Sequence, residues 1–79
     1  MSSTNSELIA EFNDALNQAY QIIRLYQRFI RKNIQALVSE VDQETRERLE
    51  EDIECLHRQK AVAELCIETF NRSIAELTE

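Results

Sequence analysis

The chain has 79 residues, a formal net charge of −6 and neither glycine nor proline. At average usage of about 7% glycine and 5% proline, about nine of these residues would be expected. Their absence excludes Gly-rich phosphate loops and Pro-rich ligand segments, and it argues against the Gly-dependent turns of an all-β fold. The negative charge argues against nonspecific binding of the whole molecule to nucleic acid or to anionic membranes. The composition therefore predicts a single all-α domain with a blunt, polar turn.

The first predicted helix spans residues 7–40 and follows a polar tail over residues 1–6. The residues Thr4 to Glu7 are typical of a capping box. Apolar residues then recur every three or four positions, in two rows that cover about half of the helix circumference. We expect the inward row to be Leu8, Phe12, Ala15, Ala19, Ile22, Tyr26 and Phe29, flanked by Ile9, Leu16, Ile23, Ile30 and Leu37.

Asn33 falls where this pattern calls for an apolar residue. It either fixes the register of the helix pair or lies at the edge of a seam that drifts onto Ile34, Leu37 and Val38. We favour the drifting seam.

The segment from Asp42 to Arg48 contains no apolar residue, which predicts a polar turn over about residues 39–45. Asp42 is expected to cap a second helix over residues 43–78, with Ser39 as the alternative cap. The apolar phase changes across this segment, which favours a chain reversal over one continuous rod. If the two helices pair symmetrically about residue 43, Lys60 lies near Tyr26.

The second helix carries a seam whose members alternate four and three apart. It consists of Leu49, Ile53, Leu56, Lys60, Ala63, Ile67, Phe70, Ile74 and Leu77. Lys60 either specifies the register or lays its stem along the seam and sends its ammonium group to water, and the second is more common. The predicted fold is an all-α antiparallel two-helix hairpin that completes a bundle with a partner or with a second copy.

Apolar surface exceeds what one seam can cover, so we expect a protein-binding surface. A stripe of Cys55, Val62 and Cys66 lies beside the second seam, and its small side chains allow another helix to approach closely. The predicted function is protein–protein interaction, with a helical partner, a second copy, or both. The residues expected to bind are Tyr26, Phe29, Val62, Leu65, Cys66 and Phe70.

A basic cluster lies in the first helix, where residues 21–32 carry four cations and no acid: Arg24, Arg28, Arg31 and Lys32. Residues 40–54 carry eight acids and two arginines. Because the two segments meet across the turn end of a hairpin, we interpret them as complementary surfaces of the two helices. The alternative is a dimeric hairpin that binds nucleic acid, or acts as a small regulator, through the basic cluster.

We expect no catalytic residue, no metal and no cofactor, and hence no enzyme. Glu54 and His57 form an E-x-x-H pair like that of di-iron bundles, but the first helix offers no carboxylate at a matching height. Glu47 with Glu51, and Glu50 with Glu54, are more typical of a solvated helix face than of an acid–base pair.

The two cysteines predict a reduced, cytoplasmic protein. Cys55 and Cys66 are eleven residues apart, about 16 Å along a helix, so they cannot bridge to each other within one chain. The polar amino terminus has no signal-peptide pattern, and no apolar run approaches the roughly 18–20 residues that span a bilayer.

From Asn17 to Phe70 the layout resembles one known family. QAYQIIRLYQRFIRK, a polar VDQET turn and an apolar second helix are similar to the small acidic co-chaperones of bacterial type III secretion needle subunits. The resemblance implies a helical hairpin with an apolar face that docks on a larger helical-repeat chaperone, which in turn holds the needle subunit.

Overall fold

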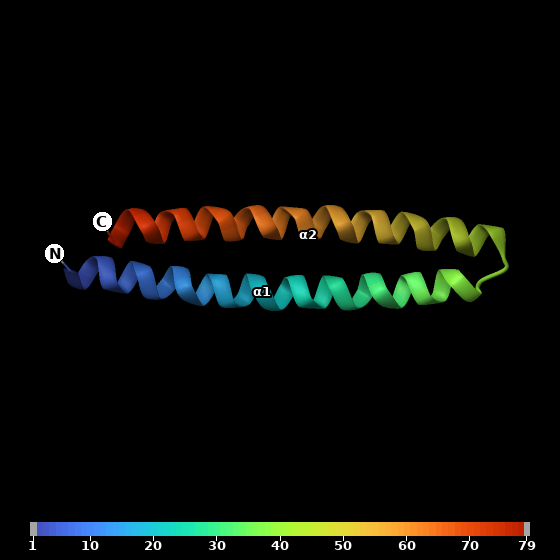
Figure 1. Ribbon diagram of the computed structural model, residues 1–79, viewed down its shortest axis with the longest axis horizontal. Helices are drawn as coiled ribbons and strands as arrows, with labels where there is room; N and C mark the ends of the chain where they lie inside the picture. Colours follow the sequence, from blue (N-terminus) through green and yellow to red (C-terminus); the bar gives the residue numbers. More distant parts are fainter. Residues whose placement is uncertain (1, 79) are drawn as a thin grey trace.

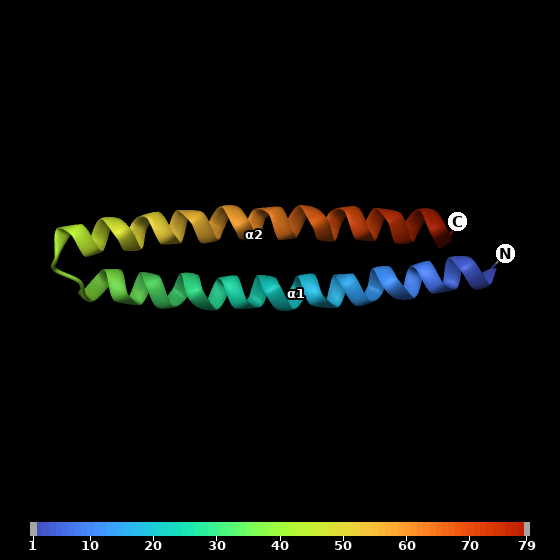
Figure 2. The ribbon, with the colours of Figure 1, turned by 180° about the vertical axis from the view of Figure 1, so that it is seen from behind.

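The protein is a single antiparallel pair of long helices. The computed structural model describes residues 2–78, which form α1 (Ser2–Ser39) and α2 (Gln43–Thr78). The two helices lie side by side along almost their whole length, and the first and last described residues are at the same end (Figure 1). The view from behind shows the same arrangement (Figure 2). The molecule is a rod of 62 × 14 × 12 Å. The predicted all-α hairpin is confirmed.

Helix α1 begins at Ser2, five residues before the expected start, and includes the Thr4–Glu7 segment that was expected to precede and cap it. The Asn5 side-chain amide instead donates a 3.5 Å hydrogen bond to the backbone oxygen of Leu77, near the end of α2. A neighbouring helix therefore extends α1 beyond the boundary that local capping residues predict, because tertiary contacts stabilise turns that are marginal in isolation.

The turn over residues 40–42 reverses the chain without any residue at positive φ in the described part of the chain. Carbonyl groups at the end of a helix lack partners within it, and a glycine-based cap often satisfies them. Here one guanidinium nitrogen of Arg46, in the first turn of α2, donates to the carbonyl oxygens of Leu37 and Glu40, both at 2.9 Å. Arg46 thus replaces the missing glycine and ties the two helices together.

Asp42 caps α2, as predicted. Its carboxylate accepts hydrogen bonds from the backbone N–H of Thr45 at 3.0 Å and from the Thr45 hydroxyl at 2.8 Å. Both bonds hold the pKa of the Asp42 carboxyl group below its ordinary value, and the bond from the backbone N–H of Thr45 has the larger effect. Ser39, the alternative cap, donates backward to the carbonyl groups of Gln35 and Ala36.

Replacing Asp42 by alanine is expected to lower the melting temperature at neutral pH by about 4–8 °C, because α2 loses its cap. Since the pKa is lowered in the folded state, the stabilisation is complete above the ordinary carboxyl pKa and is lost as pH falls through the folded-state value. Circular-dichroism melts of both proteins should therefore converge in acid. A difference that stays constant from neutral to acidic pH would contradict this role for Asp42.

The register of the hairpin is centred on residue 41. The rings of Phe12 and Phe70 are 5.9 Å apart between centroids, and this pair and the Asn5–Leu77 pair share that centre. Lys60 therefore lies at the level of residue 22, about one helical turn from the level of Tyr26 that a centre at residue 43 predicts. Its stem is half-buried and its Nζ lies 3.4 Å from a carboxylate oxygen of Glu64, as expected for a lysine that reaches out of a seam.

The row of α1 that faces α2 differs from the expected inward row. The buried side chains are Leu16, Ala19, Ile23 and Ile30, whereas Leu8, Ile22 and Phe29, which were expected to point inward, are 38–45% exposed. The expected row and the observed row both contain Phe12, Ala19 and Tyr26, and their other members lie three or four positions from these residues. Periodicity alone therefore does not select between the two rows.

The seam stays straight up to the turn. Asn33 and Leu37 are half-buried within it, whereas Ile34 and Val38 are exposed. Leu37 therefore belongs to the seam as expected, but the favoured interpretation of a seam that drifts away from Asn33 is wrong. In α2 the predicted seam is confirmed, since all nine of its members are half-buried. No residue of α2 is fully buried, so the core is a narrow strip that remains open along its sides.

Candidate protein-docking face

One side of the hairpin carries a row of mainly apolar residues on each helix, interrupted by Glu11 and Gln18 on α1 and by Gln59 on α2. We call this surface the apolar side face. Its members recur every three, four or seven positions, which keeps them on one side of each helix. They are Leu8, Ala15, Ile22, Leu25 and Phe29 of α1 with Cys55, Val62 and Cys66 of α2.

Two shallow grooves show that the rows of α1 and α2 lie on the same side. The first, near the open end, has a volume of about 260 Å³ and is lined by Ala15, Gln18, Ala19, Ile22, Ala63, Cys66 and Phe70. The second, near the turn, has a volume of about 360 Å³ and is lined by Phe29, Asn33, Asp52, Cys55, Leu56 and Gln59. Each groove thus runs between the two rows and has seam residues as its floor.

The apolar side face is uncharged over most of its length. Along the α1 row, charge occurs only at Glu11 and Lys32, which are about 30 Å apart on the helix. Between Asp52 and Glu76 of α2, the corresponding positions are Cys55, Gln59, Val62, Cys66, Thr69 and Ser73. Apolar surface of this extent, bordered by charged residues, is typical of an interaction site.

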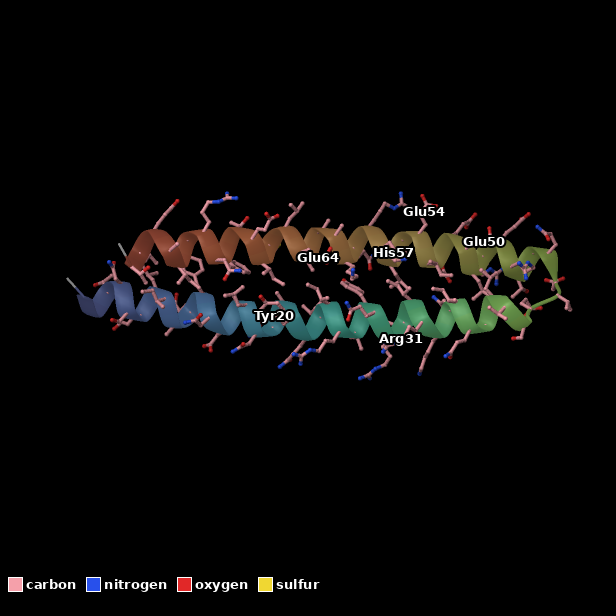
Figure 3. All side chains as sticks on the ribbon, in the orientation of Figure 1. Tyr20, Arg31, Glu50, Glu54, His57 and Glu64 are labelled. Atoms are coloured by element: carbon pink, nitrogen blue, oxygen red, sulfur yellow. The ribbon has the colours of Figure 1, made fainter. Side chains whose placement is uncertain are left out.

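The opposite side of the hairpin is polar. Its residues lie two positions from members of the apolar rows, about 160° away around each helix. Glu50, His57 and Glu64 follow one another along α2, with Tyr20 on α1 (Figure 3). On this side, α1 carries three exposed large apolar side chains, Tyr20, Ile34 and Val38, of which Ile34 and Val38 lie close to the turn.

The six residues predicted to bind a partner do not form one surface. Phe29, Val62 and Cys66 belong to the apolar side face. Tyr26 and Phe70 are half-buried seam residues, although Phe70 also lines the groove near the open end. Leu65 is exposed, but it lies about 60° from Val62 around α2, in the direction away from the seam and therefore outside the apolar side face.

Sequence reasoning missed Leu8, Ile22 and Leu25 as surface residues. The first two were placed inward, and Leu25 was assigned to neither row. The regular spacing of the α1 row from Ala15 to Phe29 is the signal that identifies this face.

The basic cluster is not neutralised by α2. Within residues 2–78, the two ion pairs both lie inside α2, Arg58 with Glu54 at 4.0 Å and Lys60 with Glu64 at 3.4 Å. Arg31 projects from the outer edge of α1 and Glu54 from the outer edge of α2, away from each other (Figure 3). The expected pairing of the two segments across the hairpin is therefore wrong.

The described residues hold no group of three or more His, Cys, Asp or Glu side chains arranged to bind a metal ion. Cys55 and Cys66 are exposed free thiols. Neither α1 nor α2 combines the length and the apolar character that crossing a bilayer requires. Comparison with known proteins finds no match to the chain among protein-family models, curated proteins or solved structures.

Proposed function

We propose that the protein is a small cytosolic adaptor or co-chaperone whose apolar side face binds and shields an apolar helix of another protein. The observation that carries this proposal is the uncharged row between Glu11 and Lys32, which neither helix of the hairpin covers. A two-helix hairpin buries only one strip of each helix, so a third helix is the natural cover for the remaining apolar strip.

The geometry suits a helical occupant. The groove near the open end has small side chains in its lining, Ala15, Ala19, Ala63 and Cys66, which leave room for side chains that an amphipathic helix presents at three- and four-residue spacing. Ile22, Leu25 and Phe29 are between 42% and 45% exposed and lose this exposure when a helix lies on the face. Burial of apolar surface contributes about 25 cal/mol per Å².

The resemblance to the co-chaperones of type III secretion needle subunits supports a specific form of this proposal. In that form, a larger helical-repeat chaperone provides the apolar helix that lies on the face. The hairpin then keeps that chaperone ready to hold its secreted cargo.

Ile22 and Ile34 provide a matched test, because they are the same residue type, 45% and 44% exposed, and lie on opposite sides of the seam, about 120° apart around α1. Ile22→Glu is expected to abolish capture of the helical partner from an extract of the native host, while Ile34→Glu retains it. Quantitative mass spectrometry of the captured proteins is the readout, and circular dichroism establishes that both variants fold. Equal capture by the two variants would show that the apolar side face is not the binding surface.

A second candidate function follows from the basic cluster, whose four cations have no ion-pair partner within residues 2–78. Such a cluster is free to contact phosphate groups of a nucleic acid. In this case Arg28→Glu abolishes a mobility shift of labelled RNA that weakens steeply with salt, while the control Arg72→Glu on α2 retains it. A shift that is absent, or that both variants retain, excludes this candidate.

A further inference from the structure

The apolar side face is complementary to itself. We infer that, when no other partner is bound, a second copy of the chain covers this face in an antiparallel, face-to-face dimer. The inference rests on the proposed function, because it names an occupant that competes for the same face.

Charge defines the register of this dimer. A twofold axis that crosses the face between residues 21 and 22 of α1 stacks α1 on the α1 of the second copy, in the opposite direction. Glu11 then lies at the level of Lys32 of the second copy, and the symmetry repeats the pair on the other side of the axis. The only two charged members of the α1 row therefore neutralise each other in both places.

Side-chain size agrees with the same register. Phe29 comes within one residue of the level of Ala15 of the second copy, and Leu25 comes to the level of Gln18. Large exposed side chains thus meet the groove near the open end, whose α1 wall is formed by Ala15, Gln18 and Ile22. At the centre, Ile22 packs beside its own symmetry mate.

The residues of α2 also fit this register, although they were not used to choose the position of the twofold axis. Because the hairpin register is centred on residue 41, an axis between residues 21 and 22 of α1 crosses α2 between residues 60 and 61. Cys55 of one copy then lies at the level of Cys66 of the other, and Gln59 at the level of Val62. The two cysteines, too far apart to bridge within one chain, are brought together between chains.

A parallel face-to-face arrangement is less favourable. It places α1 of each copy on α2 of the other at equal levels, so that Glu11 lies between Thr69 and Ser73 of the second copy. Glu11 would then be covered without a basic partner on this face. The antiparallel arrangement avoids this cost.

Disulfide crosslinking tests this register with the cysteines that the chain already has. Mild oxidation with diamide joins two thiols as one disulfide, and the two electrons and two protons pass to the diamide, which becomes a hydrazine. Cys55→Ser and Cys66→Ser each leave one thiol per chain, and in the inferred dimer identical thiols are separated by about 16 Å along the helices. A disulfide requires Cα atoms within about 7 Å.

Wild-type protein is therefore expected to form a covalent species of twice the 9.3 kDa chain mass. Each single-cysteine variant alone should remain uncrosslinked, whereas an equimolar mixture of the two should crosslink. Crosslinking of each variant alone to the same extent as the mixture would overturn the register. A sedimentation mass of one chain at every concentration would overturn the dimer itself.

Charge reversal provides a test without cysteine chemistry. Glu11→Lys and Lys32→Glu should each weaken the dimer by about fivefold or more, and the double variant should restore it. If the protein is monomeric but Ile22→Glu still abolishes partner capture, this inference fails and the proposed function stands. If the dimer forms and no captured protein responds to Ile22→Glu, the dimer stands and the proposed function fails.

Discussion

Replacing Ile30 by alanine is expected to lower the free energy of unfolding by about 2–3 kcal/mol. Ile30 is the most buried of the core side chains, at 6% exposure, and lies in the seam between α1 and α2. The value is at the low end for core isoleucines because the seam is open along its sides and the cavity can partly collapse. Urea unfolding followed by circular dichroism measures the change.

Ile34 is the control for this prediction, because it lies one helical turn further along α1 and is exposed on the polar side. Ile34→Ala should change the free energy of unfolding by less than about 0.5 kcal/mol. Equal losses from the two substitutions would mean that the seam does not follow the row that contains Ile30.

Replacing Arg46 by alanine is expected to cost about 1.5–3 kcal/mol, the range for hydrogen bonds to a charged group. The substitution removes both 2.9 Å bonds that satisfy the carbonyl groups of Leu37 and Glu40 at the end of α1. The guanidinium is partly buried, which limits screening by solvent. Melting of wild type and variant, together with hydrogen exchange near the turn, measures the loss.

Arg48 is the matched control, since it lies two residues further along α2 and is exposed. Arg48→Ala should leave the melting temperature almost unchanged. Equal destabilisation by Arg46→Ala and Arg48→Ala would indicate an effect of net charge rather than of the bonds across the turn.

The sequence predicts the hairpin, the cap at Asp42 and the complete seam of α2, because each depends on a local pattern. In α2 only one row continues at four- and three-residue spacing, so one face is selected. In α1 two rows share the positions Phe12, Ala19 and Tyr26, and both are rich in apolar residues. The choice between them depends on packing against α2, which periodicity in one helix does not contain.

The bonds of Arg46 and the separation of charged segments could not be read from the sequence for a similar reason. The absence of glycine shows that some other group must satisfy the end of α1, but it does not identify the group. Arg31 and Glu54 occur in segments that meet across the hairpin, yet their helical positions direct them outward. Charge totals of two segments do not determine which side chains face each other.

The candidate surface was half predictable. Val62 and Cys66 could be assigned to it because they belong to a stripe beside the α2 seam, whereas Phe29 was expected both to bind a partner and to point inward. Ile22 and Leu25 could not, since their role as surface residues becomes clear only when the buried row of α1 is known.

The central claim, that another helical surface covers the apolar side face, is tested most directly by thiol alkylation. Both thiols of the chain, Cys55 and Cys66, belong to this face, so their alkylation rates measure whether the face is exposed to solvent or covered by another helix. We predict slow alkylation in the assembled protein, fast alkylation in the Ile22→Glu variant and slow alkylation in the matched Ile34→Glu variant. The measurement is made at high protein concentration and with partner added. The account would be contradicted if all three proteins were alkylated as fast as the urea-unfolded chain.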